Sequence, residues 1–299
     1  MPIVGNLSNS TQPDMLDKPH LFQIVYDDAT LSSRDQGFDV LDNLDNSRPD
    51  WSEYWPIRRF LLNTELADSS YYGFFSPRFR QKTSLLATSI SALLRGRNED
   101  VVIFSPFLEQ SALFLNQVEQ GNTNHPGLND LFAELFPRET SAPALIQDAT
   151  TTIYSNFFAA KGRFWRAWLE KCERVFDLAE KQHSPAGRKL REPTIHGGKH
   201  GAQFKVFCIE RVAGLMLADD PSWTSLAPFA YKMPLLDPRF EPHRDLLTCL
   251  DLLKSSARRA GNHDFYLQTY RRMRKNVLAA ARGPQVAAAK RRTALTARK

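Results

Sequence analysis

Short apolar segments alternate with helix-forming segments along the first hundred residues, and this alternation constrains the fold more than any other feature of the sequence. Residues 21–25 (LFQIV), 71–75 (YYGFF) and 100–104 (DVVIF) are rich in β-branched and aromatic side chains, a composition typical of buried strands. Between them, residues 49–62 and 84–96 carry helical patterns. Strands that alternate with helices predict an α/β protein with a mostly parallel central sheet flanked by helices.

The remainder of the chain is richer in helices. Its patterns predict helices over 108–121, 126–136, 162–182 and 203–218, with helical structure continuing to about residue 282. Residues 151–160 predict one more strand. Turn-forming residues predict a loop over 35–50 and a mobile loop over 184–201. We therefore expect a flexible N-terminus over 1–20, a single α/β domain over 21–270 with a helix-rich C-terminal part, and a separate basic segment over 271–299.

Neither export nor a membrane span is predicted. No apolar run approaches the roughly 18 residues that cross a bilayer, and the N-terminus lacks the basic start and apolar middle of a signal peptide. Cys172, Cys208 and Cys249 are few, odd in number and far apart. That pattern favours reduced thiols and excludes a cysteine-rich zinc site. We expect a cytoplasmic protein.

The positive charge of the chain is concentrated at its C-terminal end. Residues 271–299 hold ten of the 39 lysines and arginines and no acidic residue, so the rest of the chain has 29 basic against 33 acidic residues. This segment predicts peripheral contact with an anionic membrane surface at the inner membrane face, contact with nucleic acid, or a disordered or amphipathic solubilising tail. Because the basic charge belongs to this segment only, the composition does not favour nucleic acid as a partner of the whole protein.

Several familiar catalytic motifs are missing. The sequence contains no P-loop, no Gly-x-Gly-x-x-Gly after a strand and no Gly-x-Ser-x-Gly elbow. His196 and His200 are four apart, but two glycines lie between them, which disfavours a metal-binding helix. No Asp-x-Asp occurs. These absences disfavour ATPase, dinucleotide-dependent and α/β-hydrolase functions.

The strand over 71–75 ends in an unusual concentration of cations. Arg78, Arg80 and Lys82 follow Ser76-Pro77 within a few positions. In open α/β sheets, ligands bind beyond the carboxyl ends of strands, and arginine and lysine there suit a phosphate group. The alternative is that these side chains are solvated turn residues.

The order of seven segments resembles bacterial sugar transferases of surface-polysaccharide clusters, which include capsule and O-antigen glycosyltransferases. The segments are YDD, NSRPDWSEYWPIRRFL, YYGFFSPRFRQKT, DVVIFSPF, EQGNTNHPGL, YSNFFAAKGRFWRAWL and FKVFCIERVAGLML, within about residues 21–220. The resemblance implies a Rossmann-like, GT-A type nucleotide-sugar fold. It also implies transfer of a hexosyl group from a nucleotide sugar to a saccharide or lipid-linked acceptor.

The resemblance also implies a donor site. The first strand of this fold ends against the nucleotide, which here implies Tyr26 and Asp27. The third strand usually ends in a metal-binding Asp-x-Asp, but this chain has Ser105-Pro106-Phe107 there. No metal ligand is therefore assigned, although Mn²⁺ or Mg²⁺ stays an option, and Ser105 is a donor-binding candidate. Preorganised cations would replace the charge of a metal. The candidates are Arg58, Arg59, Arg78 and Lys82.

An inverting sugar transfer also needs a general base for the acceptor hydroxyl. Glu210 is conspicuous in an otherwise apolar helix and is the catalytic candidate, with an ion pair to Arg211 or Arg174 as the alternative. Asn156 at a strand end is a candidate for the acceptor, although it is equally suited to cap the next turn. Trp55 offers a stacking face to a sugar.

Three functions follow from these features. The first is a glycosyltransferase of surface-polysaccharide synthesis. The second is a non-catalytic saccharide- or partner-binding protein on the same fold, which the missing Asp-x-Asp favours. The third is nucleic-acid binding through residues 271–299.

Overall fold

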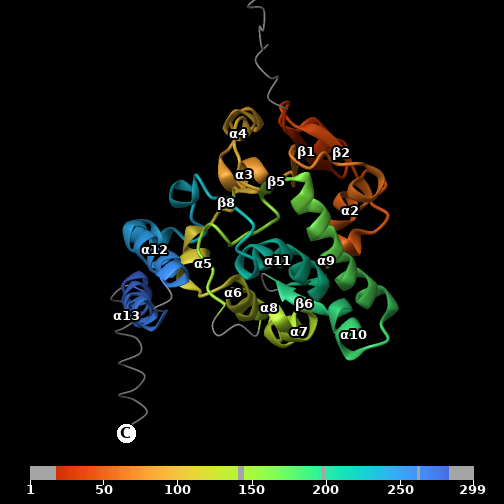
Figure 1. The fold of residues 1–299 in the computed structure, drawn as a ribbon. Coiled ribbons are helices and arrows are strands. Elements are labelled where there is room, and N and C mark those ends of the chain that lie inside the picture. Colours follow the sequence, from red (N-terminus) through yellow and green to blue (C-terminus); the bar gives the residue numbers. More distant parts are fainter. Residues whose placement is uncertain (1–17, 141–144, 197–198, 261–262, 283–299) are drawn as a thin grey trace, which may run out of the picture.

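The structure is a computed structural model that describes residues 18–140, 145–196, 199–260 and 263–282. Its centre is a six-stranded sheet with the order β2-β1-β3-β5-β4-β8 (Figure 1). The strands are β1 (His20–Val25), β2 (Asp39–Asp42), β3 (Tyr71–Phe75), β4 (Val101–Ile103), β5 (Phe158–Lys161) and β8 (Ser225–Leu226). Among these strands only β5 runs antiparallel to its neighbours. The predicted α/β class with a mostly parallel sheet is confirmed.

Helices pack around this sheet and form most of the C-terminal half. They are α1 (Asp28–Ser32), α2 (Tyr54–Asn63), α3 (Phe79–Thr83), α4 (Ala87–Leu94), α5 (Leu108–Leu113), α6 (Gln117–Asn124), α7 (Leu128–Leu135), α8 (Pro137–Thr140), α9 (Gly162–Lys181), α10 (Pro185–Arg191), α11 (Phe204–Asp219), α12 (Arg244–Ala260) and α13 (His263–Ala281). The 3₁₀ helices are η1 (Pro49–Trp51), η2 (Ala230–Lys232) and η3 (Pro238–His243), and a separate hairpin consists of β6 (Pro193–His196) and β7 (Lys199–Gln203).

Successive side chains of a strand point to opposite sides of the sheet, and both sides are covered by other elements. Phe74 of β3 packs edge-on against Trp165 of α9, with ring centroids 4.9 Å apart. Its neighbour Phe75 packs on the other face against Phe79 of α3, at 4.4 Å. Continuous burial of this kind explains why the central strands read as apolar runs rather than as alternating ones.

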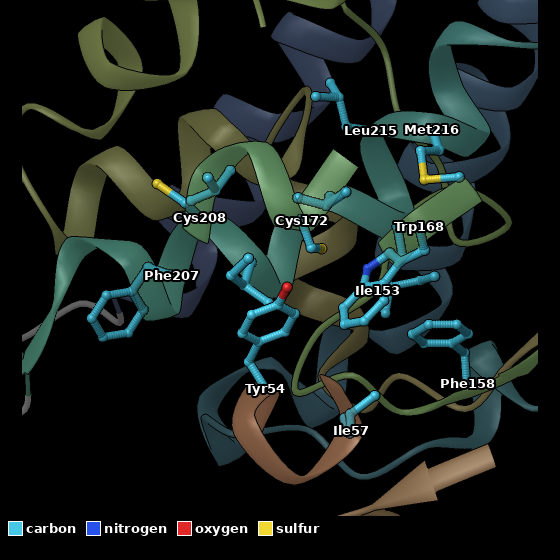
Figure 2. Close-up of a cluster of buried hydrophobic side chains, with 14 of the residues drawn as sticks. Tyr54, Ile57, Ile153, Phe158, Trp168, Cys172, Phe207, Cys208, Leu215 and Met216 are labelled. Carbon is cyan, nitrogen blue, oxygen red and sulfur yellow. The ribbon is translucent and has the colours of Figure 1, made fainter. Parts of the chain in front are cut away.

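A cluster of large side chains joins α2 to α9 on one face of the sheet (Figure 2). Tyr54 of α2 points toward Cys172 of α9, and Trp168 lies beside Ile153 and Phe158. The Tyr54 hydroxyl donates to Glu173 at 2.6 Å. This contact fixes the start of α2, and Glu53 directly precedes Tyr54.

Two predicted loops contain regular structure. Residues 39–42, within the expected 35–50 loop, pair in parallel with β1 as strand β2. Only Leu41 of this edge strand is buried, so the sequence has no alternating apolar pattern that would predict a strand there. The mobile loop predicted over 184–201 is also wrong for its described part: α10 and the β6–β7 hairpin occupy it. Ser184 caps α10 by accepting from the Gly187 N–H at 3.0 Å.

One predicted helix is divided in two, and one predicted strand is shorter than expected. The helix over 108–121 is divided into α5 and α6, because Asn116 caps α6 by accepting from two backbone N–H groups at 2.8 and 3.0 Å. The strand over 151–160 reduces to β5, since residues 154–157 form a turn before it. The helices over 162–182 and 203–218 are present as α9 and α11.

At the C-terminal end, α12 and α13 pack side by side (Figure 1). The expected boundary at residue 270 falls inside α13, where Tyr270 and Val277 are both buried, so the chain has no structural break there. The expected flexible segment 1–20 reaches into β1, which begins at His20; its first 17 residues lie outside the described residues, as do 283–299. No helix in the described part of the chain has both the length and the apolar character needed to cross a bilayer.

Candidate functional site

The carboxyl ends of β1 and β3 meet where the order of the strands reverses. The chain goes from β1 to β2 on one side and then to β3 on the other side of β1. In open α/β sheets, ligands bind beyond the carboxyl ends of strands at such a point. Tyr26 follows β1 here and Ser76 follows β3. Because β5 is antiparallel, its beginning lies at this edge and adds the turn over residues 154–157.

That turn has an unusual backbone. Phe157 N–H donates to the Tyr154 carbonyl at 3.2 Å, and the two central residues, Ser155 and Asn156, have φ values of +57° and +52°. Two successive left-handed residues define a type I′ turn, which favours glycine and asparagine. Lys82 of α3 donates from Nζ to Ser155 Oγ at 3.0 Å. The cation predicted at the end of β3 is therefore fastened to the turn before β5.

Glu53 is held at this edge by the contacts of its neighbours. Arg48 pairs with Glu180 of α9 at 2.6 Å, and Trp51 Nε1 donates to the same carboxylate at 3.0 Å. Lys205 of α11, fully buried, pairs with Asp50. These contacts fix η1 between α9 and α11, so that Glu53 follows it at the start of α2 in a defined position.

A narrow cavity lies between the start of α2, the turn over 154–157 and α11. Its lining residues are Trp51, Ser52, Glu53, Tyr54, Asn156, Val206, Ile209 and Glu210. The volume of this cavity is about 10 Å³, enough for roughly one water-sized group. Two carboxylates, Glu53 and Glu210, therefore border one small space.

The surroundings of Glu53 disfavour its charged form. The pKa of Glu53 is raised from its ordinary value of 4.5 to about 7, first by burial and secondly by the charge of Glu210. Lys82 and hydrogen bonds from Asn156 and Ser76 act in the opposite direction. Part of the Glu53 surface stays accessible although protein surrounds it, as expected for a group at the bottom of a cavity. Near neutral pH the Glu53 carboxyl group is therefore about half protonated.

Tyr26 belongs to the same environment. Burial, and secondly the charge of Glu53, raise the pKa of Tyr26 well above its ordinary value. Its phenol is therefore neutral in the whole physiological range. A neutral hydroxyl beside the carboxylate pair can donate a hydrogen bond to a ligand but carries no negative charge toward it.

Asn156 carries an unmet hydrogen-bonding requirement. The residue is only 3% exposed, and its Oδ1 has no hydrogen-bond partner among the described residues. A buried acceptor left without a donor costs about 1–3 kcal/mol. Asn156 therefore destabilises the fold unless a group outside the protein donates a hydrogen bond to its Oδ1.

The structure brings together four of the predicted site residues: Tyr26, Lys82, Asn156 and Glu210. The ion pair expected as the alternative for Glu210 is a loose one, with 3.7 Å between its carboxylate and Arg211. Arg211 itself donates to the carbonyls of Gln117 and Phe207 at 2.9 and 2.8 Å. Its charge is thus largely occupied elsewhere.

Other predicted cations are held by carboxylates. Arg58 makes a bidentate pair with Glu173 of α9, at 2.6 and 2.7 Å. Arg59 pairs with Asp45 at 2.9 Å and donates to the Asp42 carbonyl. Both arginines connect α2 to neighbouring elements. Neither lines the cavity at Glu53 or is among the groups that shift the pKa of Glu53.

The remaining predicted residues have local contacts. Asp27 caps α1 by accepting from Thr30 N–H at 2.7 Å, and these hydrogen bonds lower its pKa. Arg78 is exposed at the start of α3. Trp55 donates to Ser47 Oγ at 3.1 Å, with Arg58 5.7 Å from its ring centroid.

The end of β4 does not fit a divalent metal. Ser105 Oγ accepts from the Tyr154 N–H at 2.8 Å, and Pro106 and Phe107 offer no side-chain ligand. In the part of the chain that the structure describes, no group of three His, Cys, Asp or Glu side chains is placed to hold a metal ion. His196 and His200 belong to the two strands of the β6–β7 hairpin rather than to a helix.

A larger surface hollow, of about 470 Å³, lies at the opposite edge of the sheet, between the end of α2 and the start of α9. Two of its three charged residues, Asp68 and Arg166, pair with each other, and both are at least half exposed. Because the carboxyl ends of the parallel strands face away from it, we place the functional site at the smaller cavity.

Sequence reasoning missed Glu53. The residue is the N-cap of α2, in a segment of mixed polarity, and the sequence did not reveal β2, the strand that precedes this segment in the chain. An acidic residue at the start of a helix that follows a parallel strand was the available signal, because such positions lie at the ligand-binding edge.

No family model matches the chain, and neither a curated protein nor a solved structure was found to match it. Function must therefore be inferred from the geometry of the site.

Proposed function

We propose that this protein transfers a sugar from a nucleotide-sugar donor to a hydroxyl of a saccharide or lipid-linked acceptor in bacterial surface-polysaccharide synthesis. One observation carries the proposal: the carboxylates of Glu53 and Glu210 border one cavity at the reversal point of an α/β sheet, with Lys82 beside them. The finer assignment of the sheet as a GT-A type nucleotide-sugar fold is part of this proposal.

The carboxylate pair supplies acid–base chemistry. An acceptor hydroxyl attacks the anomeric carbon of the donor, the bond to the nucleoside diphosphate breaks, and the hydroxyl proton moves to the ionised member of the pair. Because the pKa of Glu53 is raised to about 7, its basicity is matched to neutral pH. Glu210 is the second carboxylate, and its charge keeps Glu53 basic.

Lys82 supplies positive charge for the leaving diphosphate. It comes from α3, directly after β3, and its Nζ is fixed by Ser155 rather than by a carboxylate ion pair. An ammonium group that is already oriented stabilises developing negative charge without reorganisation. Arg78, exposed on the same helix, and Tyr26, Asp27 and Ser105 at neighbouring strand ends are proposed to complete the donor site.

A non-catalytic saccharide-binding protein on the same fold is the second candidate. The observation that favours it is the commitment of Arg58 and Arg59 to structural ion pairs, which leaves little positive charge for a diphosphate. Contact with an anionic membrane through the exposed Arg271, Arg272 and Lys275 of α13 is compatible with either candidate.

Ligand-dependent stability tests the proposal. The full chain is heated with a panel of nucleotides and nucleotide sugars, with and without Mn²⁺ or Mg²⁺. A ligand that binds only the folded state adds about 2.7 kcal/mol at 100 times its Kd. A shift with one nucleotide sugar that is absent with the free nucleotide supports the transferase. A flat response from folded protein contradicts it.

A further inference from the structure

We infer that the cavity bordered by Asn156, Glu53 and Glu210 is a subsite for a saccharide hydroxyl group, which binds there whether or not a nucleotide sugar is present. The inference rests on the proposed function for the reaction that the hydroxyl undergoes, but the binding step is independent of it. The ligand class follows from the chemistry of the three lining groups.

All three groups offer hydrogen-bond acceptors to the cavity. Asn156 Oδ1 is buried and has no donor among the described residues, and each carboxyl group keeps accepting capacity whether or not Glu53 carries its proton. A complementary ligand must therefore present hydrogen-bond donors. A phosphate, which offers only oxygens and negative charge, is repelled by two carboxylates and belongs on the Lys82 side.

The size of the cavity narrows the choice further. With a volume of about 10 Å³ it admits one water-sized group and not a sugar ring. An O–H group on a ring that stays outside the cavity fits this space. The apolar Val206 and Ile209 also line it, and they suit the C–H surface of a sugar better than a hydrated ion.

A metal ion is the less favourable occupant. Lys82 already places a positive charge close enough to lower the pKa of Glu53. The cavity has two carboxylates and one amide oxygen, but with a volume of about 10 Å³ it has no room for the waters that complete the coordination shell of Mg²⁺. A neutral donor adds no charge beside Lys82, and it satisfies Asn156 Oδ1 directly.

The turn over 154–157 offers a matched pair of variants. Asn156→Gly and Ser155→Gly each place glycine at a left-handed position, where it is preferred, so both should fold. Only Asn156→Gly removes the unpartnered acceptor, whereas Ser155→Gly removes the hydroxyl that receives Lys82.

Binding is measured by ligand-observed NMR on the full chain with glucose, galactose, mannose and N-acetylglucosamine, each up to about 50 mM because single-sugar affinities are weak. We expect at least one sugar to bind, Asn156→Gly to weaken it about tenfold or more, and Ser155→Gly to bind it as the unmodified protein does. If Asn156→Gly binds the sugar as tightly as the unmodified protein, the proposed hydroxyl subsite is wrong.

Two further outcomes also decide the question. Binding of none of these sugars, or stabilisation by Mg²⁺ or Mn²⁺ that Asn156→Gly abolishes, contradicts a hydroxyl subsite. The proposed function fails separately: free sugar binding with no response to any nucleotide sugar leaves the subsite intact and identifies a non-catalytic saccharide-binding protein.

Discussion

Replacement of Glu53 by glutamine tests the electrostatics of the site without any assumption about substrate. In the folded protein the pKa of Glu53 is about 7, against an ordinary value of 4.5. Each pKa unit corresponds to about 1.4 kcal/mol, so the shift represents up to about 3 kcal/mol. Glutamine has nearly the same shape and cannot ionise, which removes this term.

The sign of the effect follows from proton linkage. Between pH 4.5 and about 7 the folded protein keeps the Glu53 proton that the unfolded chain has lost, so this residue makes folding less favourable as the pH rises. The stability that the protonated Glu53 contributes is fully present below the pKa of this residue in the unfolded chain, 4.5, and is lost above its pKa in the folded protein, about 7. Relative to the unmodified protein, Glu53→Gln should therefore gain up to about 3 kcal/mol in unfolding free energy across that window.

Urea denaturation at a series of pH values, at constant ionic strength, measures the difference. Glu170→Gln is the matched control, because Glu170 is an exposed residue of α9 outside the cavity. We expect its stability to follow that of the unmodified protein at every pH. A constant difference between Glu53→Gln and the unmodified protein across the window would refute the coupling of Glu53 with its surroundings.

Three more substitutions separate the roles of the neighbouring residues. Glu210→Gln removes the charge that raises the pKa of Glu53, so the rising limb of the kcat/KM profile should move to lower pH; an unmoved limb contradicts the pairing. Lys82→Met should weaken nucleotide-sugar affinity about tenfold in calorimetry and spare free-sugar affinity, whereas equal losses would show a general disruption. Arg58→Ala should cost about 2 kcal/mol of stability through the unpaired Glu173, with unchanged nucleotide-sugar affinity; weakened affinity would return Arg58 to the donor site.

The fold was predictable where strands are buried on both faces. All five residues of β3 are buried, and such a strand shows in the sequence as a short run rich in aromatic residues. β2 was not predictable, since a four-residue edge strand with a single buried side chain has no apolar pattern. The turn before β5 escaped because Ser155 and Asn156 adopt left-handed backbone conformations inside a segment that reads as continuous strand.

The site was predictable only in part, because side chains meet through tertiary packing. Glu210 and Lys82 stood out by local contrast, the first in an apolar helix and the second after an aromatic strand. Arg58 and Arg59 carry the same charge as Lys82, but distant carboxylates from α9 and the loop after β2 hold them. The position of Glu53 depends on the contacts that hold η1 between α9 and α11, and these contacts leave no mark in its own sequence neighbourhood.

The central claim, that the Glu53–Glu210 cavity supports sugar transfer from a nucleotide sugar, is tested most directly by release of nucleoside diphosphate. The full chain and its Glu53→Gln and Glu210→Gln variants are incubated with each member of a nucleotide-sugar panel and a mixture of saccharide acceptors. We expect release from one donor class, dependent on acceptor, lower by about two orders of magnitude or more in Glu53→Gln, and retained with a shifted pH profile in Glu210→Gln. Release at the unmodified rate in Glu53→Gln, or from no donor at all, would contradict it.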